Sequence, residues 1–317
     1  MGHDGRVNIL GVHLSAAGCT VAKANRAGVP ESVERVAIGA PEPTLAALEA
    51  VLAKHKPEAA TLLGIACGDP LDWRRGIIQS PPNMPGWDQI PIVSRWAGKF
   101  GCRVFLMNDA NASALAEWRF GAGRECRNMI YLTAGSGMGA GLILDGRLYE
   151  GTTGSAGEIG HIRLAPHGPL GYGKEGSLEG FCSGGGIVHM AKAWAYEQDG
   201  HVVFNPGAIE QITLEDVGEA AQAGDGVARE IFETAGRKLG EAMALLIDLL
   251  NPERIIVGRL YGRYRPWLEP AMRQVVEQEA LARPLGVCEI LPAALGEAIG
   301  EHAALCVGPY RAGMWNG

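Results

Sequence analysis

Two polar residues end the apolar stretch RVFLMND at positions 103–109. The stretch is typical of a β-strand, and the alanine-rich segment after it predicts a helix that Gly121 closes. Asn108 and Asp109 then have two interpretations. Either residue type caps the first turn of a helix well. Alternatively, Asp109 is a carboxylate at the carboxyl end of a strand, placed as a general base toward a hydroxyl group.

A glycine-rich turn, TAGSGMGAG at 133–141, joins two further expected strands. Backbone N–H groups in such turns can surround phosphate oxygens, and Ser136 adds a hydroxyl between Gly135 and Gly137. Such turns are common, so this one alone identifies no ligand. An earlier turn lies within ILGVHLSAAGCTVAKAN, where small residues follow His13. It is built either as a phosphate-binding turn or as an ordinary β-hairpin.

A third group of polar residues follows the glycine-rich turn. Glu158 and His161 are three residues apart in GSAGEIGHI, so they share one face of a helical turn. A carboxylate beside an imidazole can bind sugar hydroxyls, whereas the simpler interpretation is a surface turn with an incidental ion pair. Glu179, in EGSLEG, adds a further carboxylate.

The elements that carry these groups follow an order that occurs twice: hairpin strands, then alternating helices and strands. In the first half the sequence predicts, after the hairpin, a strand at 32–40, a helix at 43–55 with Thr44 as its N-cap, a strand at 60–67, a helix at 90–101, the strand at 103–109 and the helix at 110–121. The second half has a strand at 128–135, a hairpin at 140–151 turning at Asp145-Gly146, a helix at 226–250, a strand at 253–258, a helix at 266–281, a strand at 287–293 and a helix at 296–308. The segment 160–225 remains hard to assign.

This order predicts an α/β protein with a largely parallel sheet in each half. Two similar halves imply a cleft between them, and such folds bind ligands at the carboxyl ends of their strands.

The composition limits the classes of function. The chain has 317 residues and a formal net charge of −7, which argues against a non-specific nucleic-acid binder. No apolar run is long enough to span a membrane, and the polar start is unlike a signal peptide. Seven cysteines without C-x-x-C spacing indicate reduced thiols, and we expect a cytoplasmic protein.

Together, four segments resemble the ROK family of sugar kinases and sugar-responsive repressors, within the actin-like ATPase superfamily. The resemblance extends from Ile9 to about Val307, and its most similar segments are 64–87, 108–123, 135–161 and 249–258. It implies a two-lobed, ribonuclease H-like α/β fold with duplicated βββαβαβα-type halves around a central cleft. The expected lobes are 1–120 plus 305–317, and 121–304. A homodimer is the expected assembly.

The resemblance also assigns roles. Asp109 would be the base that deprotonates a sugar hydroxyl for attack on the γ-phosphate of ATP, with Mg²⁺ as the accompanying ion. Substrate-binding positions would be Asn108, Glu158, His161 and Glu179, with Gly68 and Asn83 in loops near the sugar. The phosphate turn Gly135, Ser136 and Gly137, together with Gly258, would face the nucleotide.

The sequence departs from the family pattern at three places, two of which, the first phosphate motif and Arg259, lie on the nucleotide side. The first phosphate motif, D-x-G-G-T, aligns with HLSAA, so His13 replaces an acid that helps to hold Mg²⁺ and Ala17 replaces a threonine. The cysteines of the family's zinc motif become Leu170, Tyr172 and Ser177, so we expect no structural zinc and no metal-binding residues. Arg259 follows Gly258 where the family has a second glycine.

The resemblance leaves three possible functions. The first is an ATP-dependent kinase of a hexose or N-acetylhexosamine. The second is a sugar-binding sensor or regulator that has lost phosphoryl transfer. The third, a DNA-binding repressor, is disfavoured because the first strand begins near Val7, which leaves no room for a helix-turn-helix domain before it. The expected partner is a small-molecule sugar, with neither nucleic acid nor membrane. The sequence does not identify the sugar.

Overall fold

The computed structural model describes residues 7–81, 84–197 and 208–315. The chain divides into two compact units, which are treated separately below. Unit 1 comprises 1–124, 146–154 and 295–317, and unit 2 comprises 125–145 and 155–294. The lobes expected from the sequence, 1–120 with 305–317 and 121–304, remain a prediction; the two units differ from them in placing 121–124, 146–154 and 295–304 in unit 1.

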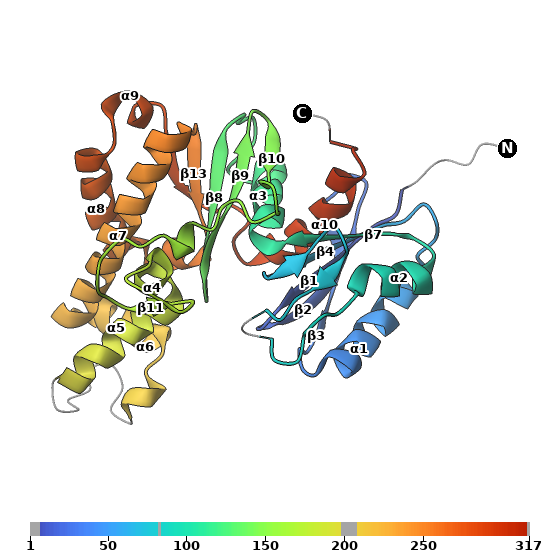
Figure 1. The fold of residues 1–317 in the computed structure, drawn as a ribbon, viewed down its shortest axis with the longest axis horizontal. Helices are drawn as coiled ribbons and strands as arrows, with labels where there is room; N and C mark the ends of the chain where they lie inside the picture. Colours follow the sequence, from blue (N-terminus) through green and yellow to red (C-terminus); the bar gives the residue numbers. More distant parts are fainter. Residues whose placement is uncertain (1–6, 82–83, 198–207, 316–317) are drawn as a thin grey trace. The chain divides into compact units, whose positions relative to one another are not determined.

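Unit 1 is built on a five-stranded sheet with the strand order β3-β2-β1-β4-β7 (Figure 1). The antiparallel strands are β1 (Ile9–Ser15), β2 (Gly18–Ala24) and β3 (Pro30–Val36), whereas β4 (Leu62–Cys67) and β7 (Arg103–Asn108) run parallel to β1. The carboxyl ends of β1, β4 and β7 therefore meet at one edge.

The two faces of this sheet carry different side chains. Leucine, valine and isoleucine side chains form a core with α1 (Pro41–Lys54) and α2 (Ile92–Phe100) on one face. Glycine and alanine dominate the other face, which α10 (Ile299–Arg311) covers, and α3 (Asp109–Phe120) packs against α10. The remaining elements are the short β5 (Leu71–Asp72) and β6 (Ile77–Ile78), and a 3₁₀ turn at Gly296–Ala298.

Close backbone approach fixes α10 on the sheet. A Cβ atom placed on Gly64 of β4 would lie 2.3 Å from the carbonyl oxygen of Ala304, and one on Gly11 of β1 would lie 2.7 Å from the carbonyl carbon of Ala304. No side chain fits there without moving the helix. The fully buried Glu117, near the end of α3, accepts hydrogen bonds from the backbone N–H of Ala122 (2.8 Å) and of Leu295 (2.9 Å). The end of α3 is thereby tied to the segment that leads into α10.

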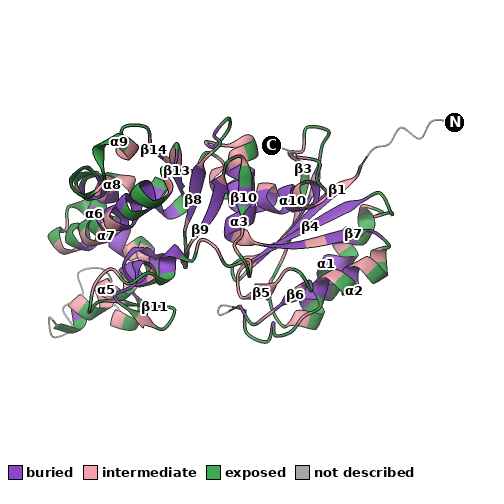
Figure 2. Ribbon diagram, turned by 45° about the horizontal axis from the view of Figure 1, so that its top comes forward, coloured by how far each residue is buried: buried purple, intermediate pink, exposed green. Residues whose placement is uncertain are grey.

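The second five-stranded sheet has the order β10-β9-β8-β13-β14, and all of its strands except β10 belong to unit 2. Its strands are β8 (Met129–Ala134), β9 (Met138–Leu144), β10 (Arg147–Tyr149), β13 (Arg254–Val257) and β14 (Glu289–Pro292). Strand β9 is antiparallel to β8, whereas β13 and β14 are parallel to it. Figure 2 shows the central strands of this sheet as buried.

Most helices of unit 2 contribute side chains to its apolar core. Helices α7 and α8 lie side by side (Figure 1). The helices are α4 (Leu178–Cys182), α5 (Gly184–Glu197), α6 (Leu214–Ala223), α7 (Gly226–Leu250), α8 (Arg259–Glu279) and α9 (Ala282–Leu285). Two 3₁₀ turns at Ile159–His161 and Ile209–Gln211 and the short strands β11 (Leu170–Gly171) and β12 (Lys174–Glu175) complete it.

The α/β class is confirmed, with some corrections to individual elements. Thr44 is not the N-cap of α1: the helix begins at Pro41 after Ala40, because two prolines favour its first turn, and the Thr44 hydroxyl accepts a bond from Gly39 N–H (3.0 Å). Helix α8 begins at Arg259, not at 266, and is kinked at Tyr264. The last helix runs from Ile299 rather than from 296.

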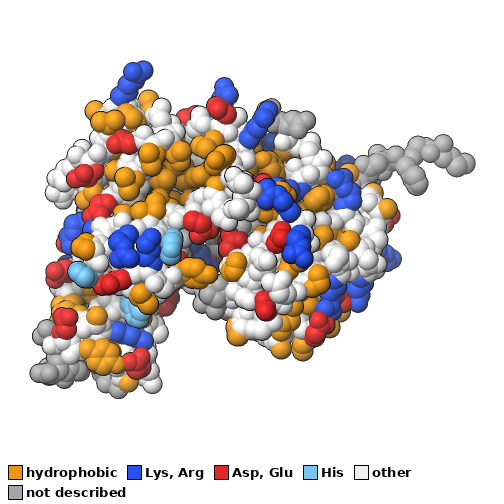
Figure 3. Space-filling model, in the orientation of Figure 1, with side chains coloured by type: hydrophobic (Ala, Val, Ile, Leu, Met, Phe, Trp, Pro, Cys, Tyr) orange, Lys and Arg blue, Asp and Glu red, His pale blue; other side chains and the backbone are white. Residues whose placement is uncertain are grey.

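The surface carries charges of both signs, interspersed over the face that Figure 3 presents. Among the described residues, no helix is both long enough and apolar enough to cross a bilayer.

The glycine contact under α10 gives a stability prediction. Gly64→Ala would place a methyl group against the backbone of α10, so we expect it to lower the free energy of unfolding by about 3 kcal/mol, as overpacking does. Urea unfolding followed by circular dichroism measures the change. The matched control is Gly98→Ala in α2, where a Cβ meets nothing within 4 Å and alanine should stabilise the helix by about 0.5–1 kcal/mol. Equal stability of the two variants would contradict the close packing.

Candidate functional site

Asn108 and Asp109 lie at the junction of β7 and α3. Asn108 is the N-cap of α3, and its side-chain oxygen accepts a hydrogen bond from Asn111 N–H (3.0 Å). The capping interpretation is therefore correct for Asn108. Its amide nitrogen also donates to the carboxylate of Asp69, which follows β4. Asn108 thus joins the ends of two adjacent strands.

Asp109 begins α3 and lies on the opposite face of β7 from Asn108, because side chains alternate along a strand. Packing around the carboxyl group raises the pKa of Asp109 above its ordinary value, and the nearby His13 opposes this rise. A raised pKa suits a carboxylate that must accept a proton.

The loop after β4 lies beside this carboxylate. A Cβ on Gly68 would be 3.7 Å from Oδ2 of Asp109, so the loop backbone runs next to it. The structure thus brings Gly68 and Asp109 together, while the expected place of Gly68 near a sugar remains a prediction. Asn83, the other loop residue assigned to the sugar, lies outside the described residues.

His13 faces α10 from β1. It is paired with Thr20 of β2 and Ala66 of β4. Burial lowers the pKa of His13, while the carboxylates of Asp109 and Glu301 act in the opposite direction. No carboxylate belongs to the turn itself, residues 15–17, where the Ser15 hydroxyl donates to the Gly18 carbonyl (2.8 Å).

In unit 2, the glycine-rich turn joins β8 to β9 and is tied to Glu179. Gly135 and Ser136 are exposed, and Gly135 N–H donates to the Gly137 carbonyl (3.3 Å). The Glu179 carboxylate accepts a hydrogen bond from Met138 N–H (3.0 Å), directly after the turn. No pattern in the sequence predicts this contact, since the two residues are 41 positions apart.

Glu158 and His161 lie on a second turn that is anchored to the same strand. Ala140 N–H of β9 donates to the Gly157 carbonyl (2.7 Å), and a Cβ on Gly160 would lie 2.0 Å from the Met138 carbonyl oxygen. The side chains of Glu158 and His161 are exposed around this 3₁₀ turn. Strand β9 therefore holds the Glu158–His161 turn, Glu179 and the glycine-rich turn together.

Hydrogen bonds shape the segment that aligns with the zinc motif. The buried Ser177 caps α4, accepting from Gly180 N–H (3.2 Å), and Gly176 N–H donates to the Pro169 carbonyl (3.1 Å). Leu170 and Tyr172 are exposed, and the Tyr172 ring lies 6.3 Å from that of His161, centroid to centroid. Within the described part of the chain, no three histidine, cysteine or acidic side chains are grouped so that they could hold a metal.

Gly258 is the N-cap of α8, at the end of β13. Its N–H donates to the Leu132 carbonyl (2.8 Å), and a Cβ there would lie 2.9 Å from the backbone nitrogen of Ala134 in β8. Gly258 thus packs against the strand that leads into the glycine-rich turn. The exposed Arg259 starts the helix.

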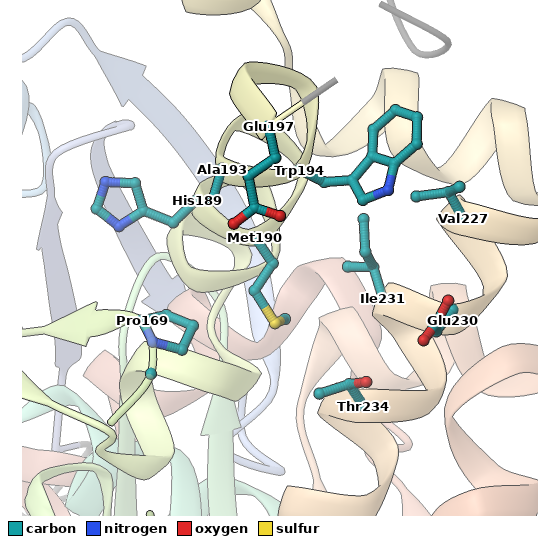
Figure 4. A pocket seen from close by; sticks show the side chains of 11 residues that line it. Pro169, His189, Met190, Ala193, Trp194, Glu197, Val227, Glu230, Ile231 and Thr234 are labelled. Carbon is teal, nitrogen blue, oxygen red and sulfur yellow. The ribbon is translucent and has the colours of Figure 1, made fainter. Parts of the chain in front are cut away.

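A cavity of about 530 Å³ lies elsewhere in unit 2, between α5 and α7. Side chains of Met190, Trp194 and Ile231 line it, as Figure 4 shows. None of the site residues predicted from the sequence belongs to its lining.

Comparison with known proteins agrees with this arrangement. The ROK family model matches residues 11–306. The chain is 33% identical over 259 residues to a glucokinase of Halalkalibacterium halodurans, covering 80% of this chain and 78% of the relative. It is 31% identical over 267 residues to a glucokinase of Thermotoga maritima, covering 84% of each.

A solved structure is similar over almost its full length. It is a ROK family glucokinase from Streptomyces griseus in complex with glucose and AMPPNP, with a TM-score of 0.78, 29% identity, and coverage of 96% of this chain and 99% of that one. The expected actin-like ATPase fold is thereby confirmed. The chain belongs to the ROK family.

Proposed function

We propose that this protein is a sugar kinase that transfers the γ-phosphoryl group of ATP to a hexose or an N-acetylhexosamine. The main support is the position of Asp109, a carboxylate with a raised pKa at the carboxyl end of β7, in a chain similar to glucokinases over most of its length. The glucose and AMPPNP in the Streptomyces griseus relative support the choice of substrates.

In this proposal Asp109 accepts the proton of one sugar hydroxyl. The freed oxygen attacks the γ-phosphorus, the bond between that phosphorus and the bridging oxygen of ADP breaks, and the bond electrons leave with ADP. Positioning of the reacting groups supplies much of the rate in this chemistry. The bond from Asn108 to Asp69 and the adjacent Gly68 backbone support a fixed carboxylate.

The sugar would be bound by Asn108, Glu158, His161 and Glu179. Sugar hydroxyls need several convergent donors and acceptors, and these side chains supply both kinds. The anchoring of the Glu158–His161 turn to β9 and the bond from Met138 N–H to Glu179 support a site that is formed before the sugar binds. Asn83 remains an expectation.

The nucleotide phosphates would lie against the backbone of Gly135, Ser136 and Gly137, with Gly258 nearby. Mg²⁺ prefers carboxylate and other oxygen ligands, and the first turn offers none of its own acids, since position 13 is an imidazole. The first turn therefore does not fit a magnesium site provided by the protein, and the nucleotide phosphates and water would have to supply most of its ligands.

A sugar-binding sensor or regulator with impaired transfer is the alternative. His13 and Ala17 in the first turn and Arg259 after Gly258 favour it, since all three changes fall on the nucleotide side of the family pattern. A cytoplasmic location and a homodimer remain predictions in either case.

Sugar binding is tested with Glu158→Ala. Removing one convergent acceptor should weaken the affinity for the best sugar in a panel of hexoses and N-acetylhexosamines by about tenfold or more, because its partner hydroxyl is left unpaired. Isothermal titration calorimetry measures this. Glu277→Ala, an exposed carboxylate in α8, is the control and should bind as wild type does. Sugar affinity that is equal in both variants would argue against this site.

Catalysis is tested by sugar-dependent release of ADP. Asp109→Asn cannot accept the proton, so we expect turnover to fall by about 10²–10⁴-fold. A restored first turn, with His13→Asp, Ser15→Gly, Ala16→Gly and Ala17→Thr combined, should raise turnover by supplying an oxygen ligand for Mg²⁺ and a freer backbone.

The same assay separates the two functions. Activity in wild type that Asp109→Asn abolishes supports the kinase. Sugar binding without ADP release, even in the restored protein, would instead support the regulator. Ordinary kinase rates in wild type with no gain on restoration would mean that the first turn is not impaired.

Metal dependence gives a third prediction. Because hydrogen bonds through Ser177 and Gly176 hold the segment 170–179, a chelator should leave the unfolding temperature unchanged, and metal analysis of tag-free protein should find well under one zinc per chain. Differential scanning fluorimetry with and without EDTA checks the first part. Stoichiometric zinc, or destabilisation on chelation, would overturn it.

A further inference from the structure

The imidazole of His13 packs against the first turn of α10. A Cβ placed on Gly300 would lie 2.6 Å from Nδ1 of His13 and 3.0 Å from its Cε1. Only glycine at position 300 therefore leaves room for this ring. Gly11, two residues before His13, faces the same helix. The His13 ring therefore lies on the face of β1 that packs against α10.

Strand register places Asp109 on the same face of the sheet. His13 is opposite Ala66 of β4, and Ala66 is opposite Met107 of β7. Met107 and Asp109 are two residues apart, so their side chains leave the backbone on the same side. Strands β1 and β7 are separated by β4, roughly 10 Å in all, and Ala66 is the residue of β4 that lies between His13 and Met107.

The other charged groups around His13 are few. Glu301 of α10 is buried and lies 3.6 Å from Arg35 of β3, and Glu297, before α10, is exposed. Asp69 is bonded to Asn108, and the Cys67 thiol belongs to the core on the opposite face. Thr20, opposite His13 on β2, has a buried hydroxyl with no hydrogen-bond partner among the described residues. Among the residues that the structure describes, Asp109 and Glu301 are thus the two acids that act electrostatically on the ring.

We propose that His13 is a positioning residue for Asp109, an imidazole that is held against Gly300 and fixes the carboxylate from the far side of Ala66. The proposal rests on the proposed role of Asp109 as the base. In this proposal His13 acts on Asp109, and is more than a replacement for the acid that helps to bind Mg²⁺ in the family.

His13 and Asp109 shift each other's pKa in a defined direction. Burial raises the pKa of Asp109 and His13 opposes the rise, so removal of the imidazole should raise the pKa of Asp109 further. The carboxylate then stays protonated to a higher pH, and the acid limb of the pH profile moves upward. Conversely, Asp109 opposes the lowering of the pKa of His13, so Asp109→Asn should lower the pKa of the imidazole.

The first arm of the test needs no enzymatic activity. The Cε1–H resonances of the histidines are titrated by NMR in full-length wild type, with His13 assigned by its absence in His13→Gln. We expect its midpoint to lie below the ordinary histidine range and to fall again in Asp109→Asn, with the resonance of the exposed His189 as the internal control. A His13 midpoint that Asp109→Asn leaves unchanged would overturn the proposal, whether or not the protein is a kinase.

The second arm uses the pH profile of kcat/KM for sugar-dependent ADP release. His13→Gln should lower kcat/KM by about tenfold at the acid end of the profile and by less at pH 8, because without the imidazole the Asp109 carboxylate is protonated to a higher pH. His189→Gln is the control. Gly300→Ala, which displaces the ring without removing it, should reproduce the acid-side loss. Parallel profiles for His13→Gln and wild type would overturn the proposal, whereas absence of ADP release from wild type would count against the proposed kinase and leave the NMR arm to decide.

Discussion

The contact between α10 and the sheet of unit 1 determines how its functional residues are held. Gly11 and Gly64 let the helix approach the backbone of β1 and β4, and α3 packs against α10 in turn. Asp109 starts α3, and Gly300 in α10 borders the His13 ring. A small-residue interface that stabilises the fold therefore also sets the position of the two ionisable groups at the strand ends.

In unit 2, a single strand, β9, holds the candidate polar residues Glu158, His161 and Glu179 in place through hydrogen bonds. The backbone of β9 binds the Glu158–His161 turn through Ala140, and Met138 binds Glu179. In both contacts the donor is a backbone N–H of β9, so they tolerate many side chains in the strand. The family's polar residues Glu158, His161 and Glu179 can therefore persist here, while the first turn of unit 1 and the positions of the zinc-motif cysteines have changed.

Local signals explain what the sequence could predict. Helix 226–250 was predicted with its observed bounds, because Asp225 caps its start and Asn251 ends it in the left-handed conformation. The junction at Asn108 and Asp109 could likewise be predicted, because an apolar strand is followed there by a capped helix. The segment 160–225 was not predicted, because hydrogen bonds between irregular turns, such as that from Gly176 to Pro169, leave no periodic pattern in the sequence. The contacts of Glu179 with Met138 and of Gly300 with His13 depend on tertiary structure in the same way.

The bond between Glu179 and the end of the glycine-rich turn has a thermodynamic consequence. The carboxylate oxygen that accepts the Met138 N–H is also the atom nearest to a Cβ on Gly137, at 2.9 Å. Under the proposed roles, a sugar that draws on this carboxylate alters the turn that faces the nucleotide. Linkage requires that each ligand then change the affinity for the other by the same factor. One shared carboxylate would thus make the two substrates cooperative, in either sense, with no larger movement of the chain.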